Sequence, residues 1–284
     1  MEDVNMKKKI QDIYNARPTS DGAGVKLDRV FGGFKAEQFD PFLLLDAFGT
    51  DKATDYIAGF PSHPHRGFET VTYMLEGKML HEDHMGNRGL LNDGDVQWMT
   101  AAKGIIHSEM PQQTEGRMSG FQLWINLPAN EKMKPASYRD ISADKIPQIH
   151  GNDYSLKLIA GNFEWNGEAH LGAVNGISTN PLYLDAILSE NANVVIPTID
   201  GYTTLVYVYQ GNITIAGKTV SEKQLATLER DGELSIDSLD KSRFLILSGK
   251  PINEPIVQHG PFVMNTFQEI EQAIQDYRDG ILTS

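Results

Sequence analysis

The sequence predicts an all-β protein with two β-barrels in tandem and a short C-terminal α-helix. Three observations favour this fold. Short runs of β-branched and aromatic residues, separated by Gly, Asn and Asp, fill most of the chain. One of these runs recurs 134 residues later, which indicates two copies of one β domain. Only the last stretch has the apolar spacing of an amphipathic helix.

The predicted strands are short, and most are bounded by turn residues. GNRG at 86–89 and NDGD at 92–95 have the composition of tight turns. Many short strands punctuated in this way are typical of an antiparallel barrel or sandwich rather than a βαβ fold. The clearest runs are ETVTYMLEG (69–77), DVQWMT (95–100), FQLWINL (121–127), TTLVYVYQG (203–211) and RFLILSG (243–249).

The internal repeat suggests where the domains divide. Aligning Gly77 with Gly211 places ETVTYMLEG over TTLVYVYQG, although two unrelated strands that end in glycine are the alternative. The segment 132–148 carries two prolines and many polar residues without a strand pattern, so we interpret it as a linker. The expected domains are an N-terminal metal-binding domain, 1–139, and a C-terminal domain without metal ligands, 140–284.

The end of the chain predicts a helix over about 266–280. Thr266 and Glu269 have the spacing of a capping box, and Gly280 lies near the expected C-terminus. We expect the apolar stripe of this helix to pack on a β domain. The stripe consists of Phe267, Ile270, Ile274, Tyr277 and Ile281.

Composition and charge exclude several classes of function. The 284 residues include 25 basic and 38 acidic ones, and a formal charge of −13 argues against direct nucleic-acid binding. The absence of cysteine excludes disulfides, thiol catalysis and Cys-ligated metal sites. No apolar run approaches the ~18 residues of a membrane helix, and no signal-peptide core is visible. We therefore expect a cytoplasmic protein with no membrane partner, and a monomer by default.

The residues that carry chemistry are four potential metal ligands in the first half. His63 and His65 are separated by one residue, as are His107 and Glu109. On a strand, residues i and i+2 point to the same face, so each pair projects together. If the two strands face each other inside a barrel, three imidazoles and one carboxylate converge. Such a nitrogen and oxygen set suits a divalent transition metal and is related to the sites of non-haem iron oxygenases.

Strand parity alone leaves a second carboxylate open. Glu69 has the same parity as His63 and His65, so periodicity points it inward as well. From the residues alone, Glu69 and Glu109 are both candidates for the carboxylate ligand.

Other charged residues near these segments have two interpretations each. His81 and His84 flank acidic residues and could form a second metal site, but a solvated turn is the favoured interpretation. Arg66 and Lys103 flank the ligand segments and could bind an anionic substrate oxygen, or they could simply lie on the surface.

The ligand segments resemble the two motifs of cupins, which are small jelly-roll barrels with a metal near the mouth. The segment 59–77 follows the first motif, a Gly, then H-x-H, a later Glu and a closing Gly. It departs from the motif in its outer spacings. The segment 94–107 resembles the second motif, which ends in Gly, two residues and His.

Longer runs make the chain similar to the pirin family, whose members are bicupins with one metal, usually iron, in the N-terminal barrel. The resemblance implies that His63, His65, His107 and Glu109 are the ligands, and that Glu69 either supports the ligands from behind or is structural. It covers most of the chain through FDPFLLLDAF (39–48), HPHRGFETVTYMLEG (63–77), HEDHMGNRG (81–89), GDVQWMTAAKGIIHSEMP (94–111) and NEPIVQHGPFVMNT (253–266).

The second half lacks the residues for a matching site. In the repeat alignment, His63 and His65 fall on Pro197 and Ile199, and no histidine occurs between 171 and 258. We therefore expect one divalent ion per chain. Fe(II) is the first choice that the resemblance implies, while Mn, Ni, Co, Cu and Zn also suit three His and one Glu.

The pirin resemblance implies a quercetin 2,3-dioxygenase that opens the flavonol ring with O2 and releases carbon monoxide. In that reaction Glu109 would accept the proton of the flavonol hydroxyl as a general base. Substrate-binding residues are not defined by any motif. Phe39, Phe42 and Trp98 are candidates to line the mouth against a planar aromatic substrate.

The resemblance also implies an alternative to catalysis. Some pirin-like proteins act as metal- or redox-dependent regulators that bind a protein partner, either a transcription co-regulator complex or a metabolic enzyme. The four ligands fit both functions, and another cupin reaction would use the same site chemistry.

Overall fold

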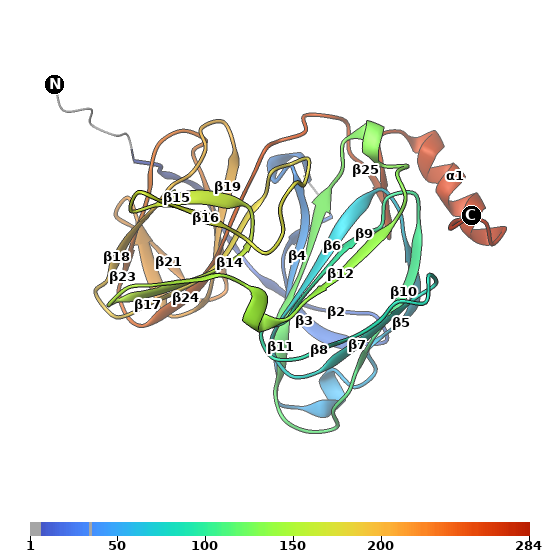
Figure 1. The fold of residues 1–284 in the computed structure, drawn as a ribbon, viewed down its shortest axis with the longest axis horizontal. Coiled ribbons are helices and arrows are strands. Elements are labelled where there is room, and N and C mark those ends of the chain that lie inside the picture. The colour runs from blue at the N-terminus through green and yellow to red at the C-terminus, as the bar shows by residue number, and fades with distance from the viewer. Residues whose placement is uncertain (1–6, 34–35) are drawn as a thin grey trace. The chain divides into compact units, whose positions relative to one another are not determined.

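The structure, a computed structural model, describes residues 7–33 and 36–284, which form two compact units (Figure 1). The N-barrel comprises Arg17–Ala143 with Ile252–Ser284. The C-barrel comprises Asp144–Pro251 with the described residues through Ala16. The units therefore depart from the expected continuous ranges at both ends of the chain, because each terminal segment belongs to the barrel of the opposite half.

Two antiparallel sheets form the N-barrel within the described residues. The larger has the order β12-β9-β6-β11-β4-β3-β2, and the smaller has the order β5-β10-β7-β8. The larger sheet contains β2 (Arg17–Asp21), β3 (Val25–Gly32), β4 (Phe42–Thr50), β6 (Phe68–Glu76), β9 (Val96–Thr100), β11 (Met118–Asn126) and β12 (Ser137–Ile141). The smaller contains β5 (Phe60–His65), β7 (Met79–Asp83), β8 (Arg88–Leu91) and β10 (Ile105–Pro111).

The C-barrel repeats this arrangement with the orders β1-β22-β19-β24-β17-β14-β13 and β18-β23-β20-β21, plus the hairpin β15-β16. The larger sheet contains β1 (Ile10–Asn15), β13 (Gln148–His150), β14 (Tyr154–Ala160), β17 (Leu182–Leu188), β19 (Thr203–Gln210), β22 (Gln224–Leu228) and β24 (Ser242–Gly249). The remaining strands are β15 (Asn162–Trp165), β16 (Glu168–Leu171), β18 (Asn193–Ile196), β20 (Asn212–Ile215), β21 (Lys218–Ser221) and β23 (Leu234–Ser238).

The matching strand orders confirm the internal repeat that the sequence predicts. Gly77 and Gly211 follow β6 and β19, the third strand of each larger sheet. Both glycines have a positive φ, +102° and +77°, a region that a side chain disfavours. A Cβ at Gly77 would also meet the side chain of Gln113 at 2.7 Å. The shared glycine therefore marks the same tight turn in two copies of one jelly-roll fold.

The terminal segments explain why the units are not continuous ranges. β1 pairs antiparallel with β22 and fills the edge position of the C-barrel that β12 fills in the N-barrel. The expected linker, 132–148, likewise contains β12 and the start of β13, because cross-strand pairing with β9 and β14 overrides its weak local pattern.

The tail consists of β25 (Val257–His259), β26 (Phe262–Met264) and α1 (Phe267–Arg278), which belong to the N-barrel (Figure 1). Thr266 caps the helix in the predicted capping box with Glu269. Only part of the predicted stripe is buried. Ile270 is buried and Ile274 is partly buried, whereas Phe267 is 73% exposed, and Tyr277 and Ile281 are exposed as well.

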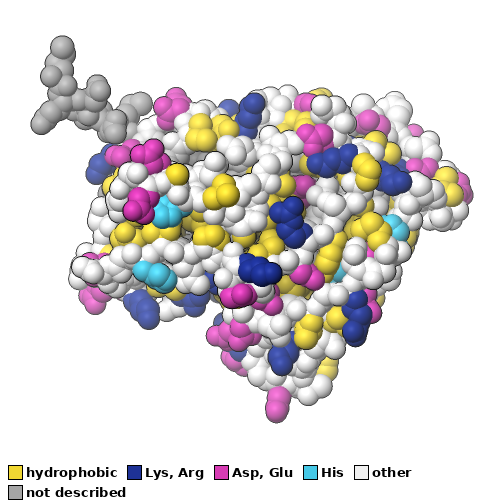
Figure 2. Space-filling model, viewed as in Figure 1, with side chains coloured by type: hydrophobic (Ala, Val, Ile, Leu, Met, Phe, Trp, Pro, Cys, Tyr) yellow, Lys and Arg dark blue, Asp and Glu magenta, His cyan; other side chains and the backbone are white. Residues whose placement is uncertain are grey.

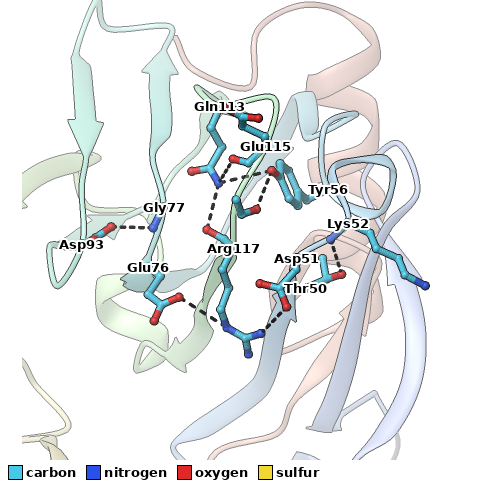
Figure 3. Close-up of polar contacts among 11 residues, drawn as sticks. Thr50, Asp51, Lys52, Tyr56, Glu76, Gly77, Asp93, Gln113, Glu115 and Arg117 are labelled. Atoms are coloured by element: carbon cyan, nitrogen blue, oxygen red, sulfur yellow. Dashed lines mark hydrogen bonds and ion pairs between the residues drawn. The ribbon is translucent and has the colours of Figure 1, made fainter.

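One end of the N-barrel is tied together by polar contacts between loops (Figure 3). Gln113 donates through Nε2 to the carbonyl oxygen of Arg117 at 3.0 Å and to the Tyr56 hydroxyl at 3.4 Å. The Arg117 guanidinium in turn pairs with Asp51 at 3.3 Å and with Glu76 at 3.6 Å. These ion pairs are exposed and contribute little to stability, so the buried strands carry most of it.

The two barrels differ in how their interiors are filled. A continuous apolar cluster fills the C-barrel, including Leu184, Val206, Ile236, Phe244 and Ile246. The N-barrel interior instead contains a cavity beside the predicted ligands. No helix in the described residues is long and apolar enough to cross a membrane. On the face drawn in Figure 2, basic side chains lie among acidic ones, without a continuous basic stripe.

Candidate metal centre

The four predicted ligands lie on two neighbouring strands of the N-barrel. β5 carries His63 and His65, and β10 carries His107 and Glu109. The strands are antiparallel with His107 opposite His63, and the register shifts between His107 and Glu109. Convergence of the two pairs was inferred on the condition that the two strands face each other inside a barrel. They are adjacent in one sheet instead, which places the histidine positions side by side.

Three imidazole rings meet on this sheet. The ligand nitrogens of His63, His65 and His107 all lie within 4.8 Å of one another, and this is the one such group among the described residues. The Nε2 atoms of His63 and His65 are 3.1 Å apart. The Nδ1 of His63 lies 2.8 Å from the carbonyl oxygen of Pro61. Because a carbonyl only accepts, the ring proton of His63 is on Nδ1 and its Nε2 keeps a free lone pair.

Burial keeps the inner two rings neutral. His65 is 4% exposed and His107 is 2% exposed. Burial lowers the pKa of both rings well below 6.5. The neighbouring rings add to this effect: His63 lowers the pKa of His65, and His65 and His63 lower the pKa of His107. Neutral imidazole is the form that binds metals. The Nε2 of His107 is buried and has no hydrogen-bond partner in the described part of the chain, a deficit that a metal ion would remove.

Glu109 lies beside this cluster and is only 5% exposed. Its Oε1 accepts a hydrogen bond from the Thr72 hydroxyl at 2.8 Å. The same hydroxyl lies 2.7 Å from Oε1 of Gln122. Because a hydroxyl carries one hydrogen, Thr72 donates to one of these oxygens at a time; rotating the Gln122 amide by 180° lets its NH2 group donate to Thr72 while Thr72 donates to Glu109. This chain of bonds orients the carboxylate within the barrel.

Comparison with known families agrees with this geometry. The family described as Pirin matches residues 24–125, and the Pirin C-terminal cupin domain matches residues 183–283. The chain belongs to the pirin family. Its fold is accordingly that of a bicupin.

Several pirin-like relatives match nearly the whole chain. A Pseudomonas aeruginosa protein named "Putative quercetin 2,3-dioxygenase" is 54% identical over 277 residues, which cover 96% of this chain and 97% of that protein. The crystal structure of quercetin 2,3-dioxygenase from Acinetobacter baumannii has a TM-score of 0.91 at 35% identity, covering 98% of this chain and 99% of that one. The bacterial pirin from Escherichia coli, solved in complex with nickel(II), has a TM-score of 0.66 at 22% identity, with coverage of 84% and 99%, and shows the shared fold.

Glu69, the other candidate carboxylate, is used elsewhere in the pirin fold. It is 1% exposed and accepts hydrogen bonds from Thr100 at 2.7 Å and from the Trp98 ring at 3.3 Å. The parity argument fails because the chain changes sheet between β5 and β6, at Gly67 with φ +95°. Burial raises the pKa of Glu69, and the two donors only partly offset this effect.

A cavity of about 580 Å³ opens beside the histidine cluster within the N-barrel. His63, His65 and Glu109 form part of its wall, and Thr72 and Gln122 continue the polar side. The apolar side is formed by Leu27, Leu44, Phe48, Phe60, Met79 and Trp124. The tail hairpin contributes Gln258, Gly260 and Pro261.

An ion pair that sequence reasoning missed also lines the cavity. The Arg29 guanidinium donates to both oxygens of Asp46 at 2.9 and 2.8 Å, and to Asp21 at 3.0 Å. Asp46 is 4% exposed; burial raises its pKa, and the hydrogen bond and charge of Arg29 lower it. The sequence carries one sign of this ion pair, because Asp46 is a single acidic residue inside the apolar run FLLLDAF. Its partner lies on β3, a pairing that no local pattern reveals.

The aromatic residues proposed for the mouth lie elsewhere. Trp98 is buried against Glu69, Phe39 stacks on Phe31 at 4.5 Å, and Phe42 is fully buried. Trp98, Phe39 and Phe42 lie in strongly apolar segments, and these segments fold into the core. Phe48, Phe60 and Trp124 line the cavity instead.

The flanking cations bind the C-terminal tail rather than a substrate. Arg66 is 4% exposed and contacts the carbonyl oxygen of Lys103, the carboxylate of Asp276 at 2.6 Å and the carbonyl oxygen of Leu282 at 3.0 Å. Lys103 donates to the carbonyl oxygen of Ser284 at 2.8 Å. The tail is thereby held next to the strand that ends at His65.

The interpretation of His81 as part of a solvated turn is wrong. Its side chain is fully buried on β7, and its Nδ1 lies 3.3 Å from the Nδ1 of His107. His84 is exposed as expected, and it accepts a hydrogen bond from the backbone of Ile106 at 3.3 Å. The acidic neighbours of His81 made the segment look solvated, whereas pairing of β7 between β10 and β8 buries it.

Proposed function

We propose that this pirin-family chain is a metal-dependent dioxygenase that cleaves flavonols such as quercetin with ring opening and release of carbon monoxide. In this proposal His63, His65, His107 and Glu109 hold one divalent ion, with Fe(II) as the first choice. The observation that carries the proposal is the group of three histidines, two of them deeply buried, beside a 580 Å³ cavity. The names of the similar proteins from Pseudomonas and Acinetobacter support the substrate class.

The cavity suits a planar aromatic molecule of drug size. Ligand pockets usually measure about 300–1,000 Å³, and this cavity falls inside that range. Phe48, Phe60 and Trp124 provide flat apolar surface. The Trp124 ring lies edge-on to His65, with centroids 5.2 Å apart. A flat substrate near the histidines would therefore lie against Trp124.

Charge on the cavity wall favours a neutral phenol over a carboxylate substrate. The wall carries the carboxyl groups of Asp21, Asp46 and Glu109 and the guanidinium of Arg29. Adding a divalent ion brings the formal charge of this set to zero when all three acids are ionised. A further anion would find no unpaired positive charge here, because Arg29 already contacts two carboxylates. A substrate that enters neutral and gives up one proton matches this balance.

Glu109 is the residue placed to take that proton. A divalent ion, when bound, supplies the Lewis acidity that lowers the pKa of a coordinated hydroxyl. The Glu109 carboxylate lies in the cavity wall, and Thr72 fixes its orientation through Oε1. Because Glu109 is 5% exposed and lies in the cavity wall, it is positioned to accept the proton of a hydroxyl bound beside it.

The proposal is tested by oxygen uptake with quercetin, using protein stripped of metal and reloaded anaerobically with Fe(II). We expect turnover in wild-type protein, loss of turnover in His63→Ala, and unchanged turnover in His150→Ala, which alters an exposed histidine of the C-barrel. No uptake by fully loaded wild-type protein would overturn the dioxygenase proposal and favour the regulatory alternative. The cytoplasmic location and the monomeric state stay predictions.

A further inference from the structure

His81 is a buried histidine for which the proposed reaction has no use. It lies on β7, directly opposite Glu109 of β10, and its exposed fraction is 0%. A buried polar ring costs free energy unless its nitrogens are paired, so its position requires an explanation.

The nearest polar partner of His81 is the predicted ligand His107. Their Nδ1 atoms lie 3.3 Å apart, and the ring centroids are 5.0 Å apart. Burial lowers the pKa of both rings, although Glu109 acts in the opposite direction on His81. Two neutral rings that meet through Nδ1 share one hydrogen, which leaves two arrangements.

The two arrangements have opposite consequences for His107. If His107 donates from Nδ1, its Nε2 keeps a lone pair and can bind a metal ion. If His81 donates instead, the proton of His107 sits on Nε2 and blocks that atom. The choice therefore depends on which nitrogen of His81 carries its own hydrogen.

The surroundings of His81 favour the first arrangement. With His107 as donor, His81 carries its hydrogen on Nε2. This atom lies 3.9 Å from the carboxylate of Asp83, too far for a hydrogen bond but close enough to interact with its charge. Asp83 is held in place by three donors, the backbone N–H of Met85 at 2.8 Å, the backbone N–H of Asn87 at 3.0 Å and the Asn87 side chain at 2.8 Å. A fixed negative charge on that side stabilises the Nε2–H form of His81.

The ring plane of His81 is fixed as well. Tyr138 of β12 stacks on it with centroids 4.8 Å apart and an interplanar angle of 25°. Gly89, directly opposite His81 on β8, leaves space for the Tyr138 hydroxyl and the Asp140 carboxylate, because a Cβ there would meet both at 2.0 Å. Gly89 therefore allows Tyr138 to stack on the His81 ring, and this stacking holds the plane of the ring beside His107.

We propose that His81 is a positioning residue that sets the tautomer and orientation of His107 for metal binding. This inference rests on the proposed metal site and adds Asp83, His81 and Tyr138 to it. Groups that orient a histidine ligand in this way typically change metal affinity about 10–100-fold when they are removed.

The first test compares the dissociation constants of Co(II) for wild-type protein, His81→Phe, His81→Asn and His150→Phe, with folding checked by circular dichroism. We expect about 10–100-fold weaker binding and an altered Co(II) absorption spectrum in His81→Phe. His81→Asn keeps an acceptor oxygen near the position of Nδ1 and should recover most of the affinity. His150→Phe, in the C-barrel, should match wild-type protein.

A second measurement uses the wild-type protein and does not depend on a variant that folds. In the zinc-loaded protein, ¹⁵N shifts of the histidine rings should show His81 protonated on Nε2 and His107 on Nδ1. Protonation of His81 on Nδ1 would overturn the inference, as would a folded His81→Phe with wild-type affinity and spectrum. Failure of wild-type protein to bind any metal would instead overturn the proposed site itself, and this inference with it.

Discussion

Replacing Lys132 with methionine should destabilise the N-barrel, because this lysine is a buried connector between three segments. Its side chain is 1% exposed. The ammonium group donates to the carbonyl oxygen of Gly67 at 2.7 Å, to Oδ1 of Asn126 at 2.6 Å and to the carbonyl oxygen of Val263 at 3.0 Å. Gly67 lies two residues after His65, so the contact also supports the end of β5.

The expected magnitude follows from the partners left behind. Asn126 keeps a second donor, the backbone N–H of Leu127 at 3.0 Å, so the loss falls mainly on the two carbonyl oxygens. A buried acceptor without a partner costs about 1–3 kcal/mol, which gives a total of about 2–6 kcal/mol. For a unit of this size, each kcal/mol lowers Tm by roughly 2–4 °C, so we expect a fall of roughly 10 °C.

The assay is thermal unfolding followed by circular dichroism, with Lys134→Met as the matched control. Lys134 also carries an ammonium group, but it pairs with Glu131 at 2.6 Å and its side chain is 37% exposed. An exposed pair of this kind is worth less than about 1 kcal/mol, so Tm should hardly change. Equal effects of the two substitutions, or a Lys132→Met protein as stable as wild type, would refute the reasoning.

Three further substitutions separate the roles of other residues. Glu109→Gln should keep measurable metal binding but reduce quercetin turnover at least ~100-fold in oxygen uptake, since the base is lost; full turnover would remove Glu109 from the mechanism. Glu69→Gln should keep wild-type metal affinity in a Co(II) titration. Because burial raises the pKa of Glu69, this one carboxyl group contributes stability below about pH 4.3 that is lost as the pH rises. The stability of Glu69→Gln in urea, relative to wild type, should therefore increase between pH 4 and pH 7, and a constant difference would contradict this. Gly104→Val places a Cβ 2.3 Å from the carbonyl oxygen of Leu282 and should make the tail sensitive to limited proteolysis; unchanged cleavage would show that the tail does not depend on this contact.

The convergence of the three histidines was predictable because its signal is local. Two pairs of residues spaced i and i+2 on short strands indicate a shared face, and His63, His65 and His107 do converge. The capping box of Thr266 and Glu269 was equally clear, since a helix start depends on residues three positions apart.

Features that depend on long-range pairing could not be predicted. The parity of Glu69 was lost at a change of sheet, and the burial of His81 depends on the strands on either side of β7. Arg29 and Asp46 meet only because β3 pairs with β4. The position of the first residues in the C-barrel also depends on long-range pairing, because β1 pairs with β22, more than two hundred residues later in the chain.

The most direct measurement of the central claim is anomalous diffraction at the iron edge from crystals of Fe(II)-loaded protein. The account predicts one anomalous peak per chain in the N-barrel, bound by the Nε2 atoms of His63, His65 and His107 and by a carboxylate oxygen of Glu109. A peak bound by Glu69, a peak in the C-barrel, or loaded crystals with no peak beside the three histidines would contradict it.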